Sequence, residues 1–145
     1  MAKPALAMAL VLAGSAWATP ASELAVSHAW ARATPPGSTV GGAYLTIDNH
    51  GATPARLIAV SSSVASEAAV HVTQIAGGVA GMHETPLVVP AHGSVKLNPG
   101  GMHLMLMGLK APLVQGSHFE LRMNFEPGGV VTVSVPVLAP DSAGP

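Results

Sequence analysis

The sequence contains no cysteine, and this absence excludes several kinds of site. A chain without thiols cannot form disulfides, use a cysteine nucleophile or attach a c-type haem. It also lacks the thiolate that a blue-copper electron-transfer centre needs. Any metal site in this chain must therefore be built from histidine, methionine or carboxylate side chains.

Charged residues are also scarce, at 9% of the sequence, and no basic run occurs. We therefore expect neither nucleic acid nor an anionic membrane surface as a partner. Aspartate occurs only at Asp48 and Asp141, and no G-x-S-x-G nucleophile elbow is present. A Ser-His-Asp arrangement stays open in principle, but nothing in the sequence indicates one. The sequence therefore predicts a protein that is not an enzyme.

No apolar run is long enough to span a membrane. Residues 1–18, MAKPALAMALVLAGSAWA, combine an early Lys3, a short apolar run and an A-x-A ending. This pattern predicts a cleaved secretory signal peptide rather than stable membrane insertion, with a retained N-terminal anchor as the alternative. Cleavage leaves 145 − 18 = 127 residues, enough for one domain with one core. We expect that domain over residues 19–138 and a flexible tail over residues 139–145.

Glycine and proline are frequent, with 16 and 13 residues, and they separate short β-branched or alternating segments. This punctuation predicts an all-β sandwich or barrel. Residues 118–126 and 130–138 alternate most clearly and are joined by a Pro-Gly-Gly turn, which predicts a β-hairpin. The other segments expected to form strands are residues 24–33, 39–49, 55–62, 68–75, 79–84, 87–91, 94–99 and 102–109.

The segment GGMHLMLMGLK (residues 100–110) concentrates three of the chain's seven methionines around one histidine. Read as a strand, it places His103, Met105 and Met107 on one face and Met102 on the other, with two leucines. Methionine fills irregular apolar gaps, so core packing is one explanation. Thioether and imidazole together also suit Cu(I), which is the other explanation. This segment alone does not decide between them.

A second histidine–methionine pair lies on the preceding strands. His71 is on one expected strand and Met82 on the next, with an Ala-Gly-Gly turn between them that predicts a hairpin. Together with His103 and Met105 they form a set of two imidazoles and two thioethers. These neutral donors match Cu(I) and match Ca²⁺, Mg²⁺ and Mn²⁺ poorly. Zinc usually recruits cysteine or carboxylate as well.

The spacing of these residues resembles the periplasmic copper chaperone family written PCu(A)C. In that family a histidine, ten residues, a methionine, about twenty-one residues and a His-x-Met follow one another. Here ten residues separate His71 from Met82, and twenty, one fewer, separate Met82 from His103-Leu104-Met105. The segments AWARATPPGSTVGGAYLTIDN and NPGGMHLMLMGLKAPLVQG extend the similarity over about residues 24–138.

The resemblance implies a cupredoxin-like Greek-key β-sandwich or barrel in the periplasm, with a shallow Cu(I) site at His71, Met82, His103 and Met105. It also implies delivery of Cu(I) towards the CuA site of cytochrome c oxidase, either to the apo CuA domain or to an intermediate copper carrier. Copper storage or tolerance stays open as an alternative function. A structural β-sandwich that binds no metal and serves as a binding module is another, but it leaves the spaced set of histidines and methionines unexplained.

Other residues of the same types are expected to have ordinary roles. Met107 shares the face of the candidate site but lies one step beyond it, and His83 should project away from Met82. Packing roles are expected for Met102 and Met123, and Trp30 and Tyr44 are expected to pack in the sandwich. Solvent exposure is expected for His28, His50, His92 and His118.

Overall fold

The computed structural model describes residues 23–145, and the predicted signal peptide lies outside them. The described residues form ten strands and no helix, so the all-β prediction is confirmed. None of them forms a helix that is long and apolar enough to cross a membrane. The strands are β1 (Leu24–Arg32), β2 (Val40–Asn49), β3 (Ala55–Ser61), β4 (Ala65–Ala76), β5 (Val79–Glu84), β6 (Val88–Val89), β7 (Ser94–Lys96), β8 (Met102–Leu109), β9 (His118–Glu126) and β10 (Gly129–Leu138).

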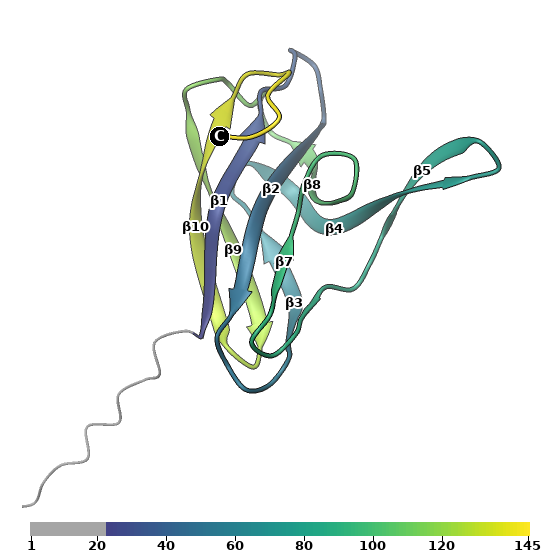
Figure 1. Cartoon of the computed structure of the whole chain (residues 1–145). Coiled ribbons are helices and arrows are strands. Elements are labelled where there is room, and N and C mark those ends of the chain that lie inside the picture. Colours follow the sequence, from purple (N-terminus) through teal and green to yellow (C-terminus); the bar gives the residue numbers. More distant parts are fainter. Residues whose placement is uncertain (1–22) are drawn as a thin grey trace, which may run out of the picture.

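The strands form two layers (Figure 1). One layer has the order β5-β4-β8-β2-β1, with β7 also paired to β2, and the other has the order β10-β9-β3-β6. The layers join where β1 pairs in parallel with β10, with Ala31 opposite Val137. Consecutive strands β2 and β3 lie in different layers, as in Greek-key sandwiches. The first and last strands therefore close the fold around one core.

Strict alternation buries one face of the central strands. Leu104 and Leu106 on β8 are 0% exposed, as are Leu121 and Met123 on β9. Met102 packs against this core. The faces predicted for residues 102–109 and the packing expected for Met123 are therefore confirmed. Because the leucine face of β8 is the core, its histidine and methionine face lies on the outside of the sandwich.

The β4–β5 hairpin projects from the body as an arm (Figure 1). Strand β4 pairs with β8 between residues 65 and 72, and with β5 between residues 71 and 76. The turn at Gly77 and Gly78 has φ angles of 58° and 78°, both in the region that a tight two-residue hairpin requires. The predicted hairpin is confirmed. All of β5 is exposed, so this ribbon presents its side chains to solvent beyond the sandwich.

Trp30 and Tyr44 are buried, but outside the main core. Their neighbours Ala31 and Ala43 belong to the core cluster, so alternation turns the two aromatic rings to the outer face of β1 and β2. The rings lie opposite each other with centroids 4.6 Å apart. The packing expected for both residues is confirmed by their burial, but they pack against each other on the outer face and not in the main core cluster.

The C-terminal residues return to this aromatic pair. The backbone oxygen of Ser142 accepts a hydrogen bond of 2.8 Å from Nε of Arg32. Residues 143–145 line a cavity together with Trp30. The flexibility expected for residues 139–145 stays a prediction.

Candidate metal centre

His71 and His103 lie directly opposite each other on the adjacent antiparallel strands β4 and β8. Residues in this relation project from the same face of a sheet. Their ring centroids are 6.3 Å apart and the ring planes are inclined by 38°. Because an imidazole nitrogen lies about 2 Å from the metal it binds, two rings at this separation can both reach one ion placed between them.

The two methionines extend this face on either side of the histidines. Met105 follows His103 by two positions and lies opposite Ala69 of β4. Met82 of β5 lies opposite Thr73, which follows His71 by two positions. Residues two apart along a strand share a face and are about 7 Å apart. The hairpin and the pairing of β4 with β8 thus bring all four predicted ligands to one face of three neighbouring strands.

A cavity of about 320 Å³ opens on this face, and Met82, His103 and Met105 line it. His71 is not among its lining residues. His103 is 7% exposed and Met82 is 58% exposed, while His71 and Met105 are half-buried. The donors therefore range from the sheet surface to the exposed arm, and the centre is shallow and open to an incoming molecule.

The two histidines differ in their hydrogen bonds. Nδ1 of His103 lies 3.1 Å from the backbone oxygen of Gly101. Since that oxygen can only accept, Nδ1 carries the proton and donates it, and Nε2 keeps its lone pair. A hydrogen bond at the second ring nitrogen is the usual way in which proteins orient a metal-binding histidine.

Nδ1 of His71 is buried and has no hydrogen-bond partner, the only such side-chain nitrogen or oxygen within residues 23–145. A buried polar atom without a partner costs about 1–3 kcal/mol. Such an atom in a folded protein calls for an explanation, and a role in binding an ion is one such explanation. Each of the two facing imidazoles therefore has at least one nitrogen without a protein partner.

The remaining histidines and methionines lie where sequence reasoning placed them. Met107 is on the site face, opposite Val40 and Glu67, but does not line the cavity. His83 lies opposite Val72, so it projects from the other face of the hairpin. The described residues contain no group of three or more histidine, cysteine, aspartate or glutamate side chains suited to a metal. The solvent exposure expected for four histidines is confirmed at His28, His50, His92 and His118.

Several other residues of the cavity were missed from the sequence. Arg32, Thr34, Gly42, Tyr44 and Thr73 line it, yet they come from three strands and a loop with no common motif. Gly42 lies opposite Met105. A Cβ atom at that glycine would lie 3.2 Å from the Tyr44 hydroxyl oxygen, so the glycine keeps the floor of the cavity open. The one local signal was that Arg32 follows Trp30 by two positions, a spacing that places both side chains on one face of a strand.

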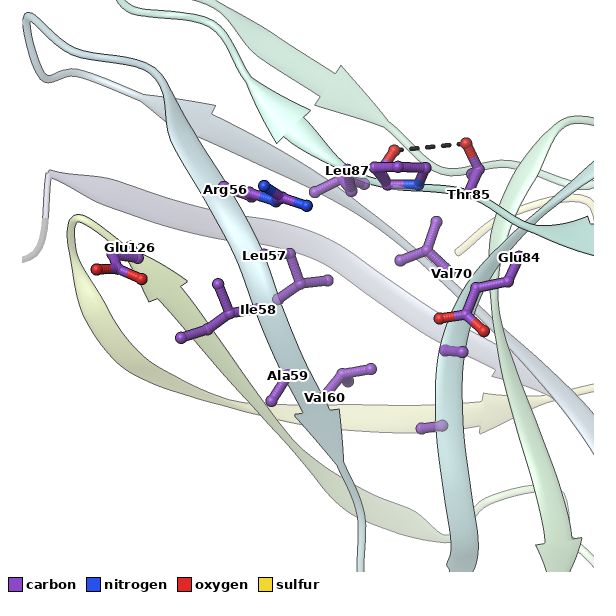
Figure 2. A pocket seen from close by; sticks show the side chains of 13 residues that line it. Arg56, Leu57, Ile58, Ala59, Val60, Val70, Glu84, Thr85, Leu87 and Glu126 are labelled. Carbon is purple, nitrogen blue, oxygen red and sulfur yellow. Dashed lines mark hydrogen bonds between the residues drawn. The ribbon is translucent and has the colours of Figure 1, made fainter.

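A larger cavity of about 560 Å³ lies between β3 and β4 (Figure 2). Apolar side chains of both strands line it, including Leu57 and Val70, and Glu84 lies at its β4 side (Figure 2). It contains no histidine or methionine. It therefore does not belong to the candidate centre despite its size.

The fold and this face define an all-β, cupredoxin-like domain with histidine and methionine on one outer surface. The chain belongs to the family described as "Putative lipoprotein LpqE-like", whose model matches residues 24–137. It is 38% identical over 114 residues to "Putative lipoprotein Lxx21020" of Leifsonia xyli subsp. xyli, a match that covers 77% of this chain and 68% of that protein.

Solved structures with the same fold include PCuAC domains. The apo PCuAC domain from PmoF1 has a TM-score of 0.70 and 30% identity, covering 81% of this chain and 95% of its own. The copper-bound PCuAC domain from PmoF2 has a TM-score of 0.69 and 27% identity, covering 81% and 94%. The solution structure of CuI-DR1885 from Deinococcus radiodurans has a TM-score of 0.64 and 31% identity, covering 89% and 85%.

Proposed function

We propose that this chain is a PCu(A)C-type metallochaperone that binds one Cu(I) ion through His71, Met82, His103 and Met105. The observation that carries the proposal is the buried Nδ1 of His71, which has no partner and belongs to a ring that faces His103. Two imidazoles and two thioethers suit Cu(I). The copper-bound and Cu(I)-bound forms of two similar structures support the same metal.

The proposed centre meets the physical needs of a protein that carries copper without reacting with it. Neutral donors hold the ion without adding negative charge to the site. Met82 is 58% exposed on the arm, so ligands of a partner can reach the ion before those of this chain leave it. Thioethers also cannot be lost as disulfides in an oxidising compartment, although they can be oxidised to sulfoxides.

The ligand set is tested by an anaerobic Cu(I) titration against a competing chelator. Met105→Leu keeps the volume and apolarity of the side chain, so the free energy of unfolding should change by less than about 1.5 kcal/mol. We expect its Cu(I) affinity to fall at least about tenfold. Met102→Leu is the matched control, because Met102 lies on the same strand and packs against the core. Wild-type affinity in Met105→Leu would remove Met105 from the site.

We further propose that the protein acts in the periplasm after cleavage behind Ala18. The description of its family and of its curated relative as lipoproteins supports a location in the cell envelope. Mass spectrometry of the protein recovered from the envelope should give Thr19 as the first residue. Recovery of the uncleaved chain from the cytoplasm would contradict both parts of this proposal.

The recipient in this proposal is the apo CuA domain of cytochrome c oxidase or an intermediate copper carrier that serves it. Copper should flow from histidine and methionine towards a site with cysteine thiolates, because thiolate is the stronger soft ligand. The test is to mix the Cu(I)-loaded protein with the apo CuA domain and, separately, with a thiol chelator of matched affinity. Faster transfer to the domain supports delivery. Equal rates would indicate copper storage or tolerance instead.

A further inference from the structure

The cavity at the candidate metal centre has polar lining residues that the proposed copper ligands do not explain. Arg32, Thr34, Tyr44 and Thr73 line it together with the methionines. All four carry hydrogen-bond donors, and one carries a positive charge. No aspartate or glutamate lines the cavity. Glu67, which lies opposite Met107 on the same sheet face, is not among the lining residues.

Arg32 is held in place by neighbours that leave its charge unpaired. Its guanidinium carbon lies 5.9 Å from the Trp30 ring centroid and 5.8 Å from that of Tyr44, within the range of a cation–π contact. Nε donates to the backbone oxygen of Ser142 at 2.8 Å. Within residues 23–145 its two terminal nitrogens have no hydrogen bond or ion pair. The two terminal nitrogens of the guanidinium are therefore held in one orientation and are free to donate hydrogen bonds to a ligand.

The Tyr44 hydroxyl is a second donor without a partner. The side chain is 8% exposed, and its hydroxyl forms no hydrogen bond with any described residue. This hydroxyl lies close to Gly42, so it belongs to the floor of the same cavity. The hydroxyl is not among the buried atoms that lack a partner, so it is open to the cavity. There the hydroxyl and the guanidinium can both donate to one acceptor with negative charge.

We propose that this cavity is a carboxylate-binding subsite in which Arg32 and Tyr44 hold the two oxygens of the ligand. A guanidinium whose Nε is already engaged offers its two terminal nitrogens, an arrangement that matches the two oxygens of a carboxylate. The carboxylate can belong to a small organic acid or to an aspartate or glutamate side chain of another protein. The subsite needs no metal, and only its position beside Cu(I) rests on the function proposed above.

The test is an NMR titration of the metal-free wild-type protein with sodium acetate, at constant ionic strength set by sodium chloride. We expect saturable shifts of the Arg32 Nε–H signal and of the amide signals of residues 42–44. Arg32→Gln should weaken acetate binding at least about tenfold. Arg122→Gln, an equal change of charge on β9 outside this cavity, should leave it unchanged.

A further variant and a second probe complete the experiment. Arg32→Lys keeps the charge but not the fork, so it should bind acetate more weakly than wild type even if Arg32→Gln does not fold. N-acetyl-aspartate amide, a blocked aspartate, tests whether the bound carboxylate can belong to a protein side chain. If it competes with acetate, an aspartate or glutamate of another protein is the source of the carboxylate. If it does not compete, the ligand is a small organic acid. Shifts that are the same in chloride and acetate, or unchanged in both Arg32 variants, would overturn the subsite. Cu(I) titration of the same samples is a separate readout, so the loss of one site is distinguishable from the loss of the other.

Discussion

Replacing each of the two facing histidines by leucine should have opposite effects on the stability of the copper-free protein. His71 carries a buried Nδ1 atom without a partner, whereas Nδ1 of His103 donates to the backbone oxygen of Gly101 at 3.1 Å. Leucine removes the unsatisfied atom in the first case and a hydrogen bond in the second. Cu(I) binding should be lost in both variants.

The expected magnitudes follow from these contacts. A buried unsatisfied polar atom costs about 1–3 kcal/mol, and His71 is half-buried. His71→Leu should therefore be as stable as the wild type or more stable, by up to about 2 kcal/mol. His103→Leu loses one hydrogen bond, worth about 0.5–1.5 kcal/mol. The Gly101 oxygen keeps a second partner, the backbone N–H of Thr73 at 3.3 Å, so no larger cost is expected.

The assay is urea unfolding of the mature protein in the presence of a copper chelator, repeated with free Cu(I) at 100 times its dissociation constant. Copper should stabilise the wild type by about 2.7 kcal/mol and should leave both variants unchanged. If copper-free His71→Leu is less stable than His103→Leu, the unsatisfied atom is not a cost of folding, and the reasoning that makes it a metal ligand is refuted.

Three further outcomes are expected. Cu(I) should outcompete Zn²⁺ at this site because two of the donors are thioethers; stoichiometric Zn²⁺ binding in a competition titration would contradict this. Cu(I) affinity should fall as the solution is acidified from about pH 7 to pH 5, since protons compete with copper for imidazole. Part of the affinity should persist, because thioethers do not bind protons in this range. A pH-independent affinity would exclude histidine ligands. Gly42→Val should weaken acetate binding by filling the cavity floor, where even a Cβ atom meets the Tyr44 hydroxyl oxygen at 3.2 Å, and unchanged acetate binding would contradict the position of that subsite.

The strands of this protein could be predicted because their signals are local. Each of the ten segments expected from turn residues and alternation contains a strand. Alternation also predicted that Leu104 and Leu106 lie on the face of β8 opposite the histidine and methionines. The glycines at 77 and 78 predicted the turn of the β4–β5 hairpin. These features depend on residues that are neighbours in sequence.

The rest depends on pairing between distant segments. His71 lies opposite His103 because β4 pairs with β8 in one register, and no local pattern specifies a register between strands so far apart. The outward position of Trp30 and Tyr44 depends on which face of β1 and β2 packs against the other layer of the sandwich. That packing involves strands distant in sequence. Arg32 becomes part of the cavity only through its contacts with those rings and with Ser142.

The central claim is that Cu(I) is held by two histidines and two methionines, and X-ray absorption at the copper edge tests it most directly. The mature protein is loaded anaerobically with one equivalent of Cu(I), and the scattering of the first coordination shell is fitted. We predict two nitrogen and two sulfur neighbours, with one sulfur lost in Met105→Leu and none lost in Met102→Leu. A shell of nitrogen and oxygen alone, or one that is the same in Met105→Leu, would contradict the account.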